Sequence, residues 1–213
     1  MMSAIRDVSV SFLAFVEQML RDDPHLSPYF DPTDPSASAL GTMILTLDTP
    51  QEMEDNEQEG VSLWLYLVQR DEQTLNRPPR RVGLDQLERR PLPLRLHYLV
   101  TPIVDREVRT DAAELEQLVL GKILQIFHDD ASIAGARLRG MLAGSGLEFF
   151  VRLEPLSLEE ITRVWDALDK PYQLCVSYEV SVVPIASAFD PARIVPVDLV
   201  TTEVGPASLT EPA

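Results

Sequence analysis

The residues best suited to bind a metal ion are His128-Asp129-Asp130, near the end of a helical pattern. A metal site needs three or four converging ligands. The other two histidines, His25 and His97, fall in a connector and in a strand pattern, without ligand spacing to His128. We therefore interpret His128 as a cationic residue at a helix C-terminus, where it complements the helix dipole, and expect no metal site.

Candidate nucleophiles and phosphate-binding loops give equally little support for catalysis. Cys175 is the single cysteine and lies in an apolar strand pattern, which is typical of a small core residue. Ser157 stands three residues before Glu160, the spacing of a helix capping box. The sequence contains neither a Gly-x-Ser-x-Gly elbow nor a Walker A phosphate loop. It thus predicts no catalytic residue and no cofactor.

One alternative leaves a ligand-binding or enzymatic role open. Arg95, His97 and Tyr178 lie on two separate strand patterns. Their side chains would line a common pocket if the two strands are neighbours in the sheet. A small ligand-binding or enzymatic α+β domain is therefore the alternative to a purely structural protein.

The composition indicates a globular domain with an acidic surface. The chain has 213 residues and a formal net charge of −16, and a domain of this length can bury a substantial core. The negative charge repels phosphate groups, so we expect no binding to nucleic acid or to anionic membranes. No stretch has the pattern of a membrane span or a secretory leader, and the lone cysteine fits a reducing cytosol.

Hydrophobic periodicity divides the chain into helices and strands. Every residue from Val61 to Val68 except Ser62 is apolar, and Leu92 to Val100 alternates, so both strands are expected in the middle of a sheet. The acidic residues 48–60 are interpreted as a solvated hairpin loop between the first two strands. The pattern predicts helices over about 3–21, 111–128 and 157–169, and strands over 40–47, 61–69, 91–101, 147–154 and 174–182.

This order, α-β-β-β-α-β-α-β, predicts an α+β fold with a mixed, largely antiparallel sheet and helices packed on one face. We place one domain at residues 1–187 and a C-terminal extension at 188–213, whose strand-like middle includes Val197, Leu199 and Val200. A segment this apolar seldom stays solvated alone. It is expected either to cover an edge of its own sheet or to add a strand to a neighbouring chain by β-augmentation.

Two charged loops of opposite sign form the candidate interface. The acidic loop carries Glu54, Asp55 and Glu57, and a proline-stiffened loop carries Arg77, Arg80 and Arg81. The negative charge of the rest of the chain acts against phosphate capture by the basic loop. We therefore expect the two loops to dock subunits head to tail.

Six segments of the chain, taken in order, resemble the sequence pattern of one protein family. With them the chain resembles, over residues 3–186, the N-terminal domain of contractile injection system cap proteins, which are similar in role to phage tail terminators. The segments are Ile5-Arg-Asp-Val-Ser9, Val61-Ser-Leu-Trp-Leu-Tyr66, Asn76-Arg-Pro-Pro79, Pro91-Leu-Pro-Leu-Arg-Leu-His-Tyr-Leu-Val-Thr-Pro102, Glu154-Pro-Leu-Ser-Leu-Glu-Glu160 and Tyr178 to Pro184.

The resemblance implies a structural protein without catalytic residues. A cap of this kind is expected to form a ring of six copies on the distal end of the inner tube, to stop tube polymerisation and to link the tube to the last sheath layer. The implied partners are other copies of the chain, tube and sheath proteins and a second cap protein. The implied location is the cytoplasm during assembly, followed by release of the particle by lysis.

Overall fold

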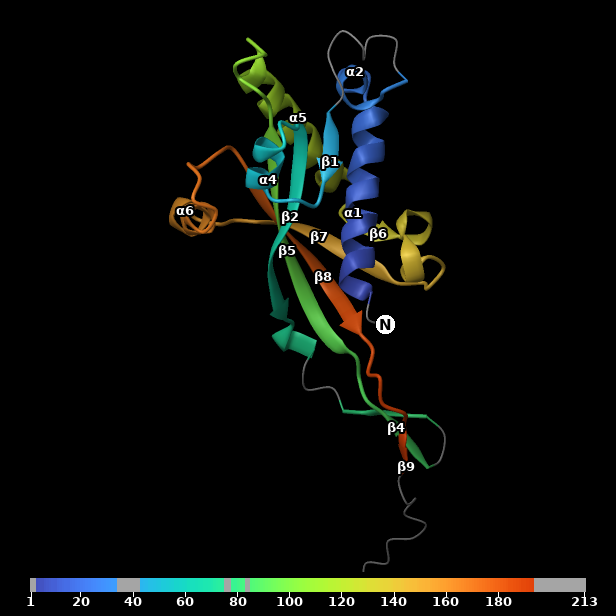
Figure 1. The fold of residues 1–213 in the computed structure, drawn as a ribbon. Coiled ribbons are helices and arrows are strands. Elements are labelled where there is room, and N and C mark those ends of the chain that lie inside the picture. The colour runs from blue at the N-terminus through green and yellow to red at the C-terminus, as the bar shows by residue number, and fades with distance from the viewer. Residues whose placement is uncertain (1–2, 34–42, 75–77, 83–84, 194–213) are drawn as a thin grey trace, which may run out of the picture.

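The computed structural model describes residues 3–33, 43–74, 78–82 and 85–193 (Figure 1). The helices are α1 (Ala4–Arg21), α2 (Ser27–Phe30), α4 (Pro50–Asp55), α5 (Ala112–Asp129) and α6 (Leu158–Asp166). Short 3-10 helices are η1 (Glu72–Thr74), η2 (Gly135–Arg137) and η3 (Gly140–Leu142). The strands are β1 (Ile44–Thr46), β2 (Gly60–Arg70), β3 (Arg80–Arg81), β4 (Gln86–Glu88), β5 (Leu92–Ile103), β6 (Ser132–Ala134), β7 (Glu148–Glu154), β8 (Val176–Ile185) and β9 (Ala192–Arg193).

Six strands form the main sheet, in the order β1-β2-β5-β8-β7-β6. Neighbouring strands are antiparallel except β1 and β2, which run parallel. The long strands β2 and β5 lie inside the sheet, as their apolar sequences predict, and pair from Gly60 opposite Ile103 to Arg70 opposite Leu94. The predicted α+β fold with a mixed, largely antiparallel sheet is confirmed.

The predicted hairpin loop between the first two strands is wrong, because residues 50–55 form α4. This helix begins with a capping box: Thr49 Oγ1 accepts the Glu52 N–H at 3.1 Å, and the Glu52 carboxylate accepts the Thr49 N–H at 2.9 Å. Pro50 fits the first turn, where its missing N–H costs no helical hydrogen bond. The helix belongs to a crossover, so β1 and β2 pair in parallel.

Gly60 permits the close approach of β1 and β2. Its φ of +143° is rarely adopted by residues with a side chain, and a Cβ at this position would lie 1.8 Å from the Ile44 carbonyl oxygen. The Ile44 N–H donates to the Glu59 carbonyl at 3.0 Å. A side chain at position 60 is therefore incompatible with this pairing.

The main core lies between the sheet and the helices α1 and α5. Phe12 of α1 lies 5.0 Å from the ring of Tyr98 and 5.3 Å from that of Phe127 in α5, and Phe127 lies 5.0 Å from Tyr178. Burial raises the pKa of Tyr178 to about 12. Burial also raises the pKa of Tyr98, whose hydroxyl pairs with Ser9 Oγ at 2.7 Å. These aromatic contacts fix both helices on one face of the sheet.

Helix α6 lies against the opposite face, which corrects the expectation that the helices pack on one face only. Its Trp165 packs on Leu99 of β5 and on Cys175, in a cluster separate from the main core. Leu99 points away from the main core because successive side chains of a strand alternate between the two faces. Cys175 is buried, as predicted, and burial raises the pKa of its thiol.

The capping box predicted for α6 is confirmed. Ser157 Oγ accepts the Glu160 N–H at 3.3 Å, and the Glu160 carboxylate accepts the Ser157 N–H at 2.8 Å. Ser157 therefore has the structural role that its spacing to Glu160 predicts.

A second, smaller sheet in the order β3-β4-β9 stands beyond one end of the main sheet (Figure 1). In its register Arg81 lies opposite Leu87, and Leu87 lies opposite Ala192. Residues 192–193 of the predicted extension thus pair with β4 of the same chain. Val197, Leu199 and Val200 lie outside the described residues.

Within the described ranges, none of the helices has the length and apolar character needed to cross a lipid bilayer.

Candidate functional site

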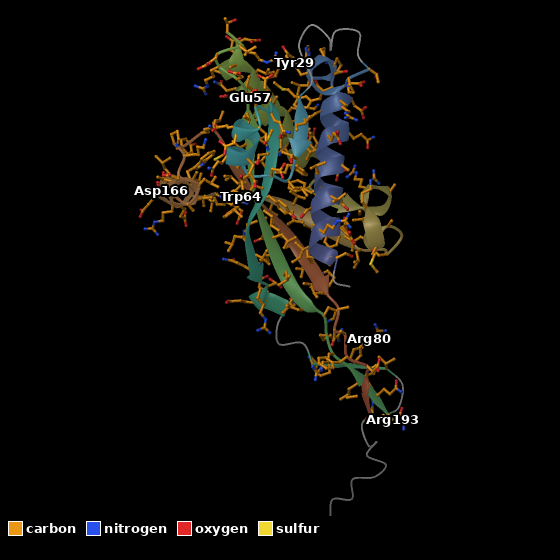
Figure 2. All side chains as sticks on the ribbon, in the orientation of Figure 1. Tyr29, Glu57, Trp64, Arg80, Asp166 and Arg193 are labelled. Atoms are coloured by element: carbon orange, nitrogen blue, oxygen red, sulfur yellow. The ribbon has the colours of Figure 1, made fainter. Side chains whose placement is uncertain are left out.

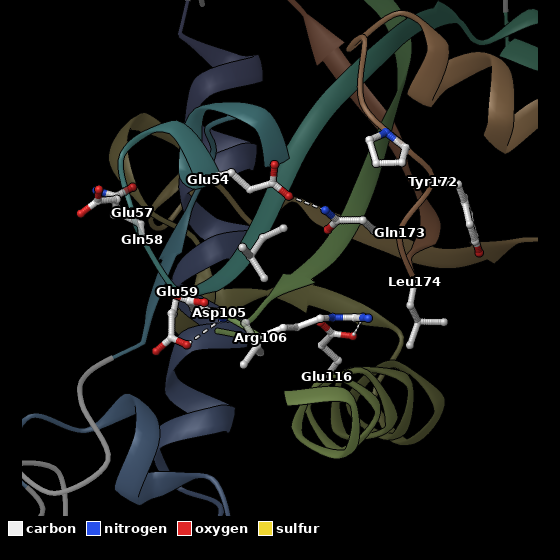
Figure 3. A pocket seen from close by; sticks show the side chains of 13 residues that line it. Glu54, Glu57, Gln58, Glu59, Asp105, Arg106, Glu116, Tyr172, Gln173 and Leu174 are labelled. Carbon is white, nitrogen blue, oxygen red and sulfur yellow. Dashed lines mark hydrogen bonds and ion pairs between the residues drawn. The ribbon is translucent and has the colours of Figure 1, made fainter. Parts of the chain in front are cut away.

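A cavity of about 550 Å³ lies among α4, the end of β5 and the segment before β8 (Figure 3). One guanidinium, that of Arg106, lines it together with a larger number of carboxylates. The acidic lining residues are Glu54, Glu57, Glu59, Asp105 and Glu116. This excess of negative charge attracts cationic groups. The five acidic lining residues and Asp55 are called the acidic end below.

Glu54 and Asp55, two residues of the predicted interface, are ion-paired within the chain. Lys170 Nζ lies 3.0 Å from a Glu54 carboxylate oxygen and 3.5 Å from one of Asp55. The side-chain amide of Gln173 also donates to Glu54 (Figure 3). The hydrogen bond to Glu54 raises the pKa of Lys170. The two carboxylates therefore tie α4 to the segment before β8, and their charge is partly compensated.

Glu59, another residue of the cavity wall, is fixed by several hydrogen bonds. Arg109 donates to both carboxylate oxygens of Glu59, with an NH2 to Oε2 distance of 2.8 Å, and the Asp105 N–H donates to Oε1 at 2.9 Å. The forked hydrogen bonds to Glu59 raise the pKa of Arg109. Arg106 similarly donates to Glu116 at 2.8 Å. Most acids of the cavity are thus already engaged.

Glu57 differs from these acids. It is exposed, and among the residues that the structure describes its carboxylate has neither an ion pair nor a hydrogen bond. The neighbouring Gln58 lines the same cavity, and its Oε1 is buried without a hydrogen-bond partner in the described part of the chain. The cavity therefore offers a carboxylate and an acceptor oxygen to a cationic side chain.

The basic residues lie at the opposite end of the molecule. Figure 2 places Arg80 and Arg193 there, far from Glu57. Arg80 and Arg81 form β3 and are exposed. Arg77, the third arginine of the predicted interface, lies outside the described residues. Arg80, Arg81, Arg89, Arg90 and Arg193 are called the basic end below.

Contacts beside the small sheet orient two arginines of the basic end. The Arg89 guanidinium lies 4.6 Å from the ring centroid of Phe189, and Arg90 Nε donates to the Pro78 carbonyl at 3.0 Å. Phe189 itself is 71% exposed. The basic end thus combines positive charge with an exposed aromatic ring, a composition that suits protein contacts.

The alternative pocket at Arg95, His97 and Tyr178 does not form. Their strands, β5 and β8, are neighbours, as that hypothesis required. However, Tyr178 lies opposite Tyr98 and belongs to the main core, whereas Arg95 and His97 lie on the other face of the sheet. These three side chains therefore do not line a common pocket.

Arg95 and His97 instead belong to a row of polar side chains across that face. Arg95 NH2 lies 2.7 Å from an Asp71 carboxylate oxygen, and its NH1 lies 3.1 Å from one of Glu179. His97 Nδ1 lies 2.8 Å from Glu154 Oε1. The sequence interpretation did not single out these three acids. For Glu179, the signal was the alternation of polar with apolar residues along β8.

The fold and its two charged ends define an α+β domain whose surface is suited to contacts with other proteins. Residues 14–198 match the family model of the Pvc16 N-terminal domain, and the chain belongs to this family. The resemblance to the cap proteins of contractile injection systems is confirmed. No curated protein matches the chain.

Two solved structures share the fold. The chain is similar to the PVC sheath/tube terminator of an extracellular contractile injection system in its extended state, with 18% identity, a TM-score of 0.53 and coverage of 93% of this chain and 64% of the other. It is also similar to the anti-feeding prophage tube-terminating cap, with 18% identity, a TM-score of 0.56 and coverage of 88% and 58%. The chain therefore spans about three-fifths of the length of these two proteins.

Proposed function

We propose that this chain is a structural cap subunit, without enzymatic activity, that terminates the tube and sheath of a phage-tail-like contractile injection system. The observation that carries the proposal is the fold shared with two terminators over 93% and 88% of the chain. In this role the chain assembles in the cytoplasm onto a particle that lysis releases. Tube and sheath proteins, and a second cap protein, are its proposed partners.

The placement of charge supports assembly into a ring. The acidic end and the basic end lie at opposite ends of one molecule, so they cannot meet within the chain (Figure 2). Complementary patches at different places on a subunit form a heterologous interface, which closes into a ring when the rotation between subunits permits it. We propose a ring of six copies in which the basic end of one copy docks at the acidic end of the next.

The structure suggests which residues form this contact. Glu57 is the exposed acid without an intramolecular partner among the described residues, whereas Glu54 and Asp55 are held near it by Lys170. Arg80 and Arg81, with the flanking Arg77, would supply the basic side. We assign Glu57 the leading role at the acidic end because binding to it breaks no existing ion pair.

The extension at residues 188–213 gives a second contact. β9, the last described strand, pairs with β4 in the small sheet, whose residue Arg193 belongs to the basic end. We propose that the following residues, including Val197, Leu199 and Val200, act as an arm that adds a strand to another subunit. Within the proposed extension 188–213, which follows a 1–187 domain, the arm would begin after β9.

The test is assembly of the full chain with tube and sheath proteins of its particle, viewed by negative-stain electron microscopy. The variant Arg80→Ser/Arg81→Ser is expected to fold, by far-UV circular dichroism, but to give uncapped tubes of uncontrolled length. The control Arg6→Ser/Arg163→Ser removes two exposed charges elsewhere, with side-chain exposures of 79% and 73%, and is expected to assemble normally.

A charge exchange makes the test specific to the proposed pair of ends. Glu57→Arg alone should also impair assembly, and combining it with Arg80→Glu should restore part of it. Normal rings and tube lengths in all three charge variants would refute the interface. A wild-type chain that neither forms rings nor alters tube length would refute the cap function.

A further inference from the structure

The second half of β2 lies at a border of the main sheet. β2 has 11 residues and pairs with β5 from Gly60 to Arg70. On its other side, within the described part of the chain, β2 pairs with β1 alone, and this pairing covers only Gly60–Ser62. Leu63–Arg70, called the open edge below, therefore borders the sheet (Figure 1). Alternate residues of such an edge point their backbone N–H and C=O groups outward.

Apolar side chains are exposed on both faces of the open edge. Leu67 lies opposite the buried His97, and Val68 lies opposite the buried Leu96, so the two side chains point to different faces of the sheet. Their exposed fractions are 39% and 43%, whereas Leu63 at the start of the open edge is fully buried. A further strand beside β2 would cover both side chains, because adjacent strands pack their side chains together on each face.

A segment of this chain has the length and composition of such a strand. Residues 197–204 read Val-Asp-Leu-Val-Thr-Thr-Glu-Val and lie between Pro196 and Gly205-Pro206. β-branched residues favour strands, and proline and glycine delimit them. The segment and the open edge both have eight residues. The segment lies outside the described residues and belongs to the arm proposed above.

Val197 can reach the open edge of a neighbouring copy. It follows Arg193 by four residues, which span at most about 14 Å. Figure 2 places Arg193 and Trp64 of one chain far apart, so the start of the open edge in the same chain is beyond this reach. Glu59 of the acidic end directly precedes β2. Docking of the basic end at the acidic end of the next copy therefore brings Val197 to the start of that copy's open edge.

We propose, on the basis of the cap function and the head-to-tail contact proposed above, that residues 197–204 of one copy pair with the open edge of its neighbour. A segment that enters at the start of this edge runs along it in the direction of β2, so the pairing is parallel. It would continue the parallel pairing of β1, which stops at Ser62. Main-chain hydrogen bonds would then join the two copies, and the exposed Leu67 and Val68 would be covered.

The bulge in β2 sets the register of this pairing. Tyr66 is an extra residue of β2 without an opposite residue on β5. If pairing starts at the first residue of each segment and passes over Tyr66, Val200 lies beside Leu67. Glu203 then lies beside Arg70, which is exposed and has no ion pair among the described residues. The register thus matches apolar side chains with each other and an acid with a base.

Disulfide cross-linking of the full chain tests this pairing. Leu67→Cys and Val200→Cys are placed in two differently tagged chains, which both carry Cys175→Ser to remove the buried native thiol. The chains are checked by far-UV circular dichroism, mixed with tube and sheath proteins and oxidised. We expect a reducible dimer of the two chains. Leu118→Cys, at a position of α5 with 47% exposure, is the matched control for Leu67→Cys. It should give at least about tenfold less dimer, because a disulfide requires Cα atoms within about 7 Å.

A charge exchange tests the register. Arg70→Glu should lower the rate of cross-linking about threefold or more, because repulsion from Glu203 replaces attraction. Adding Glu203→Arg to the chain that carries Val200→Cys should restore the rate. Arg6→Glu, at a side chain of α1 with 79% exposure, is the control and should leave the rate unchanged. An unchanged rate in Arg70→Glu would overturn the pairing in this register.

Electron microscopy of the same samples separates the pairing from the cap function. Capped tubes without a disulfide between positions 67 and 200 would overturn the pairing and leave the cap function intact. The disulfide without capped tubes would support the pairing and count against the cap function, and the absence of both would overturn both. In a chain that carries both cysteines, a disulfide within one chain would also overturn the pairing between copies.

Discussion

Asp7 gives the sharpest test of how this fold is held together, because it is an ionisable residue buried within α1. Its side chain is 4% exposed and accepts hydrogen bonds from Ser3 Oγ at 2.7 Å and from the Met141 N–H of η3 at 3.2 Å. A Cβ on Gly140 would lie 2.5 Å from the Asp7 carboxylate, which shows how closely this loop approaches the helix. Replacing Asp7 with alanine should release the loop from α1.

The magnitude follows from the two hydrogen bonds. A hydrogen bond to a charged group contributes about 1.5–3 kcal/mol, and the carboxylate of Asp7 accepts two of them. Part of this loss is recovered because the side chain of Met141 is exposed, so water can reach the released backbone N–H. Alanine also removes the cost of burying the Asp7 carboxylate, which offsets a further part of the loss. We therefore expect Asp7→Ala to lower the free energy of unfolding by about 2–3 kcal/mol, and Asp7→Asn by about 1 kcal/mol, since the amide retains one acceptor.

Urea unfolding followed by tryptophan fluorescence measures this change. With a slope of about 2–3 kcal/mol per molar urea, the Asp7→Ala midpoint should fall by about 1 M. Asp22→Ala, at the exposed end of the same helix, should stay within about 0.5 kcal/mol of wild type. Amide hydrogen exchange should show loss of protection at Met141. If Asp7→Ala keeps both the wild-type midpoint and the protection of Met141, the carboxylate does not anchor the loop.

Three further predictions concern pH and backbone geometry. Hydrogen bonds from Thr74 and Arg95 lower the pKa of Asp71 in the folded protein. The ionised Asp71 therefore stabilises the fold fully above about pH 4, and this stabilisation is lost as the pH falls through the folded pKa. Urea midpoints should drop less between pH 7 and pH 3 for Asp71→Asn than for wild type. Burial raises the pKa of Tyr178 to about 12 in the folded protein, so with rising pH the unfolded state releases this proton first. The free energy of unfolding should therefore fall above about pH 10, and less steeply in Tyr178→Phe. Identical stability profiles of the two proteins at alkaline pH would contradict this. Gly60→Ala should lower the free energy of unfolding by more than about 3 kcal/mol or prevent folding, since the new Cβ would lie 1.8 Å from the Ile44 carbonyl oxygen. A variant with the wild-type thermal midpoint would refute the parallel pairing at this position.

Periodicity predicted the elements whose apolar faces are long and regular. β2, β5 and the helices α1 and α5 follow from apolar residues that recur at strand or helix spacing, and Ser157 with Glu160 marks the start of α6. α4 was missed, although Thr49 and Glu52 have the same capping spacing, because its acidic residues suggested a solvated loop. Charge is thus a weaker guide than a hydrogen-bonding pattern, since a short helix can be acidic and exposed when its first turn is capped.

The placement of polar side chains on the two faces of the sheet was only half predictable. The alternation along β5 correctly assigned Arg95 and His97 to one face, but the register with β8 places Tyr178 on the other. A shift of one residue in a strand moves its side chains to the opposite face, and no local pattern fixes the register between distant strands. For the same reason, the meeting of His97 with Glu154 and Glu179 could not be predicted.

The sequence by itself determined the class of fold, the central strands, the family and the presence of two oppositely charged segments, because these depend on composition, periodicity and the order of motifs. Only the tertiary structure decided where the charges lie. It placed the acidic and basic ends at opposite ends of the molecule, paired Glu54 and Asp55 with Lys170, and brought His97 to the two glutamates. These outcomes depend on contacts between residues far apart in the chain, which strand order and register fix once the sheet has formed.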